Sequence, residues 1–487
     1  MATYPSRNNN YNFKLVTTEA SIDSNPGDRK TNQIYTETVR RIERLLSRRG
    51  SNGEKDFRRV VITQEKGDLI SNECVHVHFP KEFSRLATDQ ELQISVLGPD
   101  SNPTPVHSVE YLERMKKNSE TAASRVEAWK AKHYRQQRSH KPKRERLSPL
   151  LNVGDSACVD GRTTEAAART SAAALIDVAK EAWSSRNYNC AFVLTKPPSH
   201  HAVGNTIFSR YPDEMRAGKE NENSPLGFCH INSIATAVAH LLNMPEGPAN
   251  KVCVLDFDVH HGNGNEDTFW YDPRVLTISL HQEDLWPGPE NGLAEYTGDE
   301  KCAPDSNLNV PLPPQSGDVP YARAMDEIVF PRMKMFKPEA IFVAAGFDAM
   351  KGDKYADQEV TAEWYGWCVQ ELRNRFPEVL LVLNLEGGYK PSNVETGIGR
   401  CIDALLPEVK YCFGLEDAQD VEKGGRKNSA ASRGGNSLSK DALYELKARP
   451  RERRNVIAFK AESPSAQNKL DPTAVELQNS LANLKIS

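Results

Sequence analysis

Residues 252–264 read VCVLDFDVHHGNG, and this stretch decides how the rest of the chain is interpreted. Its first four residues are apolar, as in a strand that is buried on both faces of a parallel sheet. Two carboxylates, Asp256 and Asp258, follow at once, and then a pair of imidazoles that begins with His260. Burying such groups is costly unless something offsets their charge, so a metal ion is the first candidate partner.

Apolar runs alternate with longer segments of helical periodicity through the middle of the chain. The predicted strands are residues 190–194, 252–255, 275–280, 340–345 and 379–385. The predicted helices are residues 164–183, 233–242, 321–336, 361–376 and 391–406, and Pro331 is expected to kink or split the third helix. Alternation of this kind predicts an α/β single domain with a mostly parallel central sheet flanked by helices.

Both ends of the chain are polar. Residues 1–55 and 416–487 contain few apolar positions, so we expect them to be disordered N- and C-terminal tails. The folded domain is then expected at residues 56–415, with an exposed basic insertion at about residues 130–146.

Composition limits the class of protein. The 487 residues carry 62 Lys and Arg against 66 Asp and Glu, a net charge of −4 that gives no global sign of a nucleic-acid-binding protein. The nine cysteines are odd in number and include no Cys-x-x-Cys pair, which argues against a disulfide framework. No stretch approaches the ~20 apolar residues of a membrane span, and no signal peptide is evident. We therefore expect a soluble protein of the nucleus or the cytoplasm.

Polar side chains follow the predicted strands at their carboxyl ends, where ligands bind in open parallel sheets. His200 and His201 follow the first strand, Asp348 follows the fourth, and Tyr389 follows the fifth. Each also has a plain structural interpretation when taken alone, such as a helix cap or turn for Asp348. The combination at neighbouring strand ends favours a functional site.

Asp258 and His260 are two residues apart, so their side chains project to the same face of an extended backbone. Asp348 is the candidate for a third ligand from another strand. An Asp-His-Asp set leaves one coordination position open for water or substrate, which is typical of a catalytic zinc site.

Seven motifs carry a resemblance to a known family. KPPSHHA, GFCHIN, DFDVHHGNG, TISLH, NVPLPP, AGFDA and LEGGY occur in this order between Cys190 and Tyr389. They resemble the zinc-dependent histone deacetylase family, which includes acetylpolyamine-hydrolysing relatives, and the similarity extends over about residues 60–410. Asn263 and Glu386 resemble the class II branch. The resemblance implies an arginase/deacetylase-like fold, and Gly262 at the last position of the Asp-x-His-x-Asp pattern implies one metal ion per chain.

The same resemblance implies the roles of the site residues. Asp258, His260 and Asp348 would hold the zinc ion. His201 would be the general base and His200 its electrostatic partner, oriented by Asn263 and Asp256 respectively. Tyr389 would donate a hydrogen bond to the oxyanion.

Further residues are implied to bind the substrate and monovalent cations. The substrate-binding residues would be Gly227, Phe228 and Trp286, which line a narrow tunnel for a lysine side chain. A potassium ion would lie near Asp256, Asp258, His260, Ser279 and Leu280, and a second near Phe269 and Val275. The chain departs from the family at Lys196 and Ser199, where the family usually has Arg and Gly.

Three functions follow from these expectations. The first is removal of acetyl groups from lysine side chains of histones or other proteins. The second is acetylpolyamine hydrolysis, and the third is a weakly active corepressor-type binding subunit. The expected partners are an acetylated histone or other protein and a corepressor complex; no membrane and no sequence-specific nucleic acid are expected.

Overall fold

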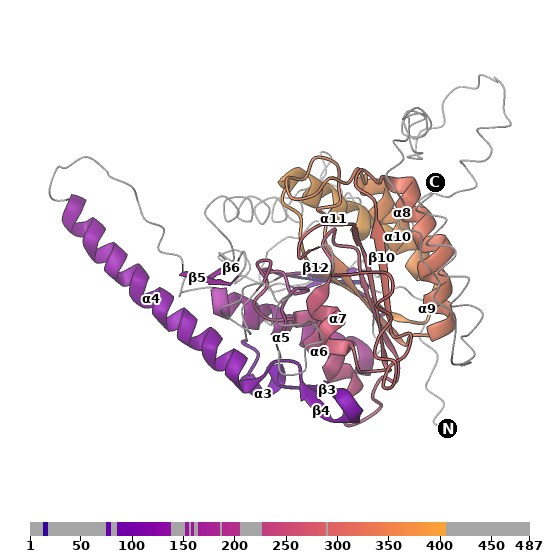
Figure 1. Ribbon diagram of the computed structural model, residues 1–487, viewed down its shortest axis with the longest axis horizontal. Coiled ribbons are helices and arrows are strands. Elements are labelled where there is room, and N and C mark those ends of the chain that lie inside the picture. Colours follow the sequence, from indigo (N-terminus) through magenta and orange to yellow (C-terminus); the bar gives the residue numbers. More distant parts are fainter. Residues whose placement is uncertain are drawn as a thin grey trace, which may run out of the picture.

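The computed structural model describes residues 13–17, 75–78, 85–137, 151–154, 157–159, 164–185, 188–204, 226–288 and 291–405. In this part of the chain an eight-stranded sheet is flanked by helices on both faces (Figure 1). The strand order is β10-β9-β8-β11-β12-β7-β1-β2, and every neighbouring pair is parallel. The expected α/β fold with a parallel central sheet is confirmed.

The strands of the sheet are β1 Phe13–Thr17, β2 Val75–His78, β7 Cys190–Leu194, β8 Val252–Asp256, β9 Val275–Gln282, β10 Asn307–Leu312, β11 Ala340–Ala345 and β12 Leu380–Leu385. Two antiparallel hairpins lie outside it. They pair β3 Ser95–Leu97 with β4 Pro103–Pro105, and β5 Leu151–Gly154 with β6 Ala157–Val159.

The helices are α3 Asp89–Leu92, α4 Val109–Gln137, α5 Thr164–Ser185, α6 Ser233–Leu242, α7 Asn263–Phe269, α8 Asp318–Ala324, α9 Phe330–Phe336, α10 Ala362–Arg375 and α11 Pro391–Leu405. The long helix α4 extends away from the sheet (Figure 1). None of the helices in the described ranges is both long and apolar enough to cross a membrane.

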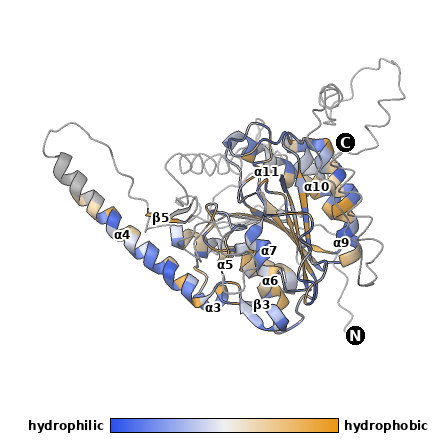
Figure 2. Ribbon diagram, viewed as in Figure 1, coloured by the Kyte–Doolittle hydropathy of each residue, from blue (hydrophilic) through white to orange (hydrophobic). Residues whose placement is uncertain are grey.

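The two faces of the sheet form two separate hydrophobic cores. Alternate residues of each central strand point to opposite faces, so Phe192 and Leu255 pack against α8–α11 while Val193 and Val254 pack against α5 and α6. Apolar residues accordingly concentrate along the strands and the helix surfaces that meet them (Figure 2). Burial on both faces explains why these strands are continuous apolar runs.

The helix predicted at residues 321–336 is divided, as Pro331 suggested. It consists of α8, a wider π-helical turn at Met325–Val329, and α9. Proline has no backbone N–H, so Pro331 cannot donate the helical hydrogen bond to residue 327, and the chain adopts a different turn there.

Other expectations differ from the structure. Strand β10 was not predicted. Strand β1 lies inside the expected N-terminal tail, so these five residues of residues 1–55 are not disordered but pair with β2 and β7. The first part of the basic run at residues 130–146 continues helix α4 to Gln137, and the exposed insertion stays a prediction. The rest of both expected tails lies outside the described residues.

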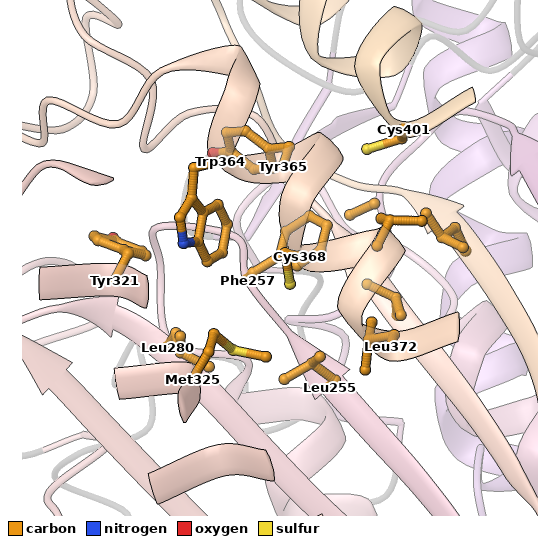
Figure 3. Packing of buried hydrophobic residues seen from close by; sticks show 14 of the residues in the cluster. Leu255, Phe257, Leu280, Tyr321, Met325, Trp364, Tyr365, Cys368, Leu372 and Cys401 are labelled. Atoms are coloured by element: carbon orange, nitrogen blue, oxygen red, sulfur yellow. The ribbon is translucent and has the colours of Figure 1, made fainter. Parts of the chain in front are cut away.

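An aromatic cluster lies beneath the carboxyl ends of β8 and β11. The ring of Phe257 lies 5.3 Å from Tyr365 and 5.8 Å from Trp364, and the ring of Phe347 lies 5.0 Å from Tyr365. Figure 3 shows Phe257, Trp364 and Tyr365 in this packing. Phe257 precedes Asp258 and Phe347 precedes Asp348 in the chain. The packing of these two rings therefore fixes the backbone that carries Asp258 and Asp348.

Candidate active site

Asp258, His260 and Asp348 converge at the ends of two adjacent strands. β8 and β11 pair Asp256 with Ala344, so the segments that follow them leave the sheet side by side. Nδ1 of His260 lies 3.1 Å from Oδ1 of Asp258 and 3.1 Å from Oδ2 of Asp348. One ligand atom from each of the three buried side chains lies within 4.8 Å of the others.

Glycines allow this close approach. A Cβ atom at Gly346 would lie 2.1 Å from Oδ2 of Asp258, and one at Gly387 would lie 2.3 Å from oxygens of both Asp258 and Asp348. The N–H of Gly387 also donates to Oδ2 of Asp258, over 2.8 Å. Any larger residue at these two positions would displace the carboxylates.

The charges of the three groups are strongly coupled. Burial raises the pKa of the Asp258 carboxyl, but nearby His200 and His260 outweigh burial and hold this pKa well below its ordinary value. Burial and the charge of Asp258 raise the pKa of Asp348 to about 7. Two buried carboxylates beside one imidazole form a donor set that fits zinc, because a divalent cation offsets their mutual repulsion.

The two histidines that follow β7 have different partners. Nδ1 of His200 lies 2.9 Å from Oδ2 of Asp256, and Nδ1 of His201 lies 2.7 Å from Oδ1 of Asn263. The structure therefore brings together the two pairs that the family resemblance implied, although the partners are 56 and 62 residues apart in the chain.

The surroundings of the two imidazoles shift their pKa values in opposite directions. Burial lowers the pKa of His200, but the carboxylates of Asp256 and Asp258 outweigh it and raise that pKa to about 10. Burial and the positive charges of His200 and His260 lower the pKa of His201 well below its ordinary value. His200 is thus cationic near neutral pH, and His201 is a neutral imidazole able to accept a proton.

Glu386 links the histidine loop to the end of β12. Its carboxylate accepts hydrogen bonds from the Ser199 hydroxyl over 2.6 Å, from the Ser199 N–H over 2.5 Å and from the His200 N–H over 3.2 Å. Its backbone oxygen accepts from the Lys196 ammonium. Ser199 and Lys196, two of the departures from the family pattern, therefore both donate hydrogen bonds to Glu386.

Aromatic rings lie beside His201 and Tyr389. Trp286 lies edge-on to His201 with ring centroids 4.7 Å apart, and Phe228 lies 5.6 Å from Tyr389. Gly227 has φ +52°, and a Cβ there would lie 2.4 Å from the His201 ring and 2.7 Å from Trp286. The predicted substrate-binding residues thus adjoin His201 and Tyr389.

Two residues of the site were not found from the sequence. Asp353 accepts the backbone N–H of Tyr389 over 2.7 Å, and the ring of Tyr355 lies 4.6 Å from that of Tyr389. The one available signal in the sequence was an acidic residue shortly after Asp348. The hydrogen-bond partners of Asp353 are backbone groups, which carry no sequence pattern.

Two of the residues expected to bind the first potassium ion, Asp258 and His260, are also candidate metal ligands, and the others lie in β8 and β9. The register of β8 and β9 pairs Asp256 with Ser279, and the hydroxyl of Ser279 accepts the N–H of Gly262 over 3.3 Å. Leu280 follows in β9, whereas Phe269 ends α7 and Val275 begins β9. Potassium binding stays a prediction.

The fold and the site together define an α/β protein with a candidate catalytic metal centre at the carboxyl ends of its strands. A family profile described as the histone deacetylase domain matches residues 87–405. The chain belongs to the zinc-dependent histone deacetylase family, on its class II-like side.

Individual relatives agree with this. Histone deacetylase 5 of Arabidopsis thaliana is 33% identical over 285 residues, which are 58% of this chain and 39% of that protein. Histone deacetylase 7 of Homo sapiens is 33% identical over 249 residues, which are 49% of this chain and 24% of that protein. The chain therefore spans well under half the length of these relatives. The crystal structure of the HDA15 HD domain matches the fold with a TM-score of 0.54 at 24% identity, covering 77% of this chain and 84% of that one.

Proposed function

We propose that the chain is a zinc-dependent hydrolase that removes acetyl groups from lysine side chains of proteins. The observation that carries the proposal is the convergence of the buried Asp258, His260 and Asp348 near His201, whose ring is oriented by Asn263. Zinc bound to those three residues would supply a Lewis acid that polarises the acyl carbonyl and lowers the pKa of a water molecule.

His201 is oriented to act as the base. The Oδ1 atom of Asn263 is an acceptor, so Nδ1 of His201 carries the hydrogen and Nε2 keeps its lone pair. This nitrogen can take a proton from water and return it to the leaving amine. The cationic His200 beside it, held by Asp256, stabilises negative charge that develops on the substrate.

The rings position the substrate and exclude water. Phe228 and Trp286 provide flat apolar walls for the extended lysine side chain, which fixes the amide relative to His201. The Tyr389 hydroxyl donates to the oxygen of the tetrahedral intermediate, a bond that strengthens in the transition state.

The test uses the purified chain and acetyl-lysine peptides, with and without a chelator. We expect turnover that the chelator abolishes and that His201→Ala reduces by at least about 100-fold. Tyr389→Phe is expected to lower kcat with little change in KM. Turnover that survives both the chelator and His201→Ala would disprove the proposal. A parallel assay with acetylated polyamines identifies small molecules as the substrate class if they alone are hydrolysed.

Partners and compartment are proposed with this activity. The substrate would be an acetylated histone or other protein, bound alone or within a corepressor complex, in the nucleus or the cytoplasm. Imaging of the tagged chain and recovery of its acetylated substrates from cells that carry His201→Ala test both points.

A further inference from the structure

We propose that Asp353 is a positioning residue that holds Tyr389 in place for the reaction. The inference rests on the proposed function, because it concerns where the Tyr389 hydroxyl is held. Asp353 lies in the segment between β11 and α10, is 8% exposed, and does not belong to the candidate metal ligands.

Both carboxylate oxygens of Asp353 accept backbone N–H groups. Oδ2 accepts from Tyr389 over 2.7 Å and from Lys390 over 3.1 Å, and Oδ1 accepts from Tyr355 over 3.1 Å. One side chain thus joins the segment before α11, which carries Tyr389, to the segment that carries Tyr355. The segment with Tyr389 contains Gly387 and Gly388 and belongs to no helix or strand, so it needs such a support.

The same segment supports the ring of Tyr389. The ring of Tyr355 meets that of Tyr389 edge-on, with centroids 4.6 Å apart and an interplanar angle of 88°. The ring centroid of Phe228 lies 5.6 Å from that of Tyr389 and 6.2 Å from that of Tyr355. Backbone and ring of Tyr389 are therefore both fixed through residues 353–355, and a shift of this segment would move the Tyr389 hydroxyl.

Asp353→Asn is a sharp test because the groups that donate to Asp353 are backbone N–H groups, which cannot reverse their roles. Asparagine keeps one acceptor and turns an NH₂ group toward a donor, so one contact becomes repulsive. Asp318→Asn is the matched control. The oxygens of Asp318 accept from the Thr361 N–H and the Thr361 hydroxyl, each over 2.7 Å, and the hydroxyl can instead accept from an asparagine NH₂.

We expect Asp353→Asn to lower kcat by about 10- to 100-fold on an acetyl-lysine peptide and to leave KM within about two-fold, because only the positioning of Tyr389 is lost. Asp318→Asn should leave both constants unchanged. In a Tyr389→Phe background, Asp353→Asn should lower kcat by less than about a further two-fold. The hydroxyl group through which Asp353 acts is already absent there.

Amide hydrogen exchange supplies a readout that is independent of turnover. In Asp353→Asn the amides of residues 387–390 should exchange faster than in the wild type, while Asp318→Asn should leave them unchanged. If Asp353→Asn does not fold, Tyr355→Leu should lower kcat and Tyr355→Phe should retain it, since only the phenylalanine preserves the ring contact.

Unchanged kcat in Asp353→Asn, or the same loss with and without the Tyr389 hydroxyl, would overturn the proposal. So would equal activities of Tyr355→Leu and Tyr355→Phe in the case where Asp353→Asn does not fold. If the wild-type chain turns over no acetyl-lysine substrate, the proposed function fails instead. The exchange measurement then still decides whether Asp353 holds the Tyr389 segment.

Discussion

Nδ1 of His201 lies 2.7 Å from Oδ1 of Asn263. The neighbouring His200 makes the equivalent contact with a carboxylate, that of Asp256. An amide orients the ring without adding charge, whereas a carboxylate raises the pKa of an imidazole. The pairing of one amide and one carboxylate therefore separates the roles of two adjacent histidines.

Asn263→Asp should shift the pH dependence of the reaction. The pKa of His201 lies below its ordinary value because of burial and the charges of His200 and His260, and a carboxylate at residue 263 would raise it. A base works only when deprotonated, so the fall of kcat/KM at low pH should begin at a higher pH, by about one unit. The measurement is a kcat/KM profile from pH 5 to 9 for both proteins. A shift toward lower pH would contradict this role of His201.

Gly227→Ala should disturb the proposed substrate-binding site. At φ +52° an alanine is strained, and its Cβ would lie 2.4 Å from the His201 ring and 2.7 Å from Trp286. Since neither ring can move without leaving its own contacts, we expect kcat/KM on an acetyl-lysine peptide to fall by about 100-fold. Gly399→Ala in α11 is the control, because a Cβ there meets nothing within 4 Å. The control should keep full activity and gain up to about 1 kcal/mol of stability. Equal activities of the two variants would contradict the substrate-binding assignment.

Metal removal should destabilise the folded chain through Asp258, His260 and Asp348. A metal that binds only the folded state stabilises it, so a chelator should lower the Tm of the wild type by several degrees. In Asp348→Ala, which lacks one ligand, the chelator should cause no such shift. Thermal unfolding followed by circular dichroism measures both. A shift of equal size in the two proteins would place the metal at another site.

The sequence predicted the parts of the fold and site that depend on local pattern. The buried strands at residues 190–194 and 340–345 are apolar throughout, and both were placed at their observed bounds. A spacing of two residues on an extended backbone predicted that Asp258 and His260 lie close together, and they do, although β8 ends at Asp256 and residues 258–260 form bends. Strand β10 contains two asparagines and a proline, so its pattern does not separate it from a loop.

What could not be predicted depends on contacts between distant backbone groups. Asp353 is identified by the N–H groups of Tyr355, Tyr389 and Lys390, which every residue except proline possesses. Glu386 could be matched to a family pattern, but its bonds to Ser199 follow only from the neighbouring positions of β7 and β12 in the sheet. Strand order and loop approach are properties of the whole fold.

Asp318 should make the stability of the chain depend on pH in a way that Asp318→Asn removes. Burial raises the pKa of the Asp318 carboxyl to about 6, against an ordinary value of 3.8, although bonds from Thr361 oppose the shift. Between these values the folded chain holds a proton that the unfolded chain has released, so the stability that this carboxyl contributes falls as the pH rises. Relative to Asp318→Asn, the wild type should lose about 3 kcal/mol between pH 3.5 and 7. Urea unfolding of both proteins across this range measures the difference, in which groups common to the two cancel. A difference in the free energy of unfolding that does not change with pH would show that the pKa of Asp318 is the same in the folded and unfolded chain. If the wild type instead gains stability relative to Asp318→Asn as the pH rises, the folded-state pKa of Asp318 is lowered and the prediction is wrong.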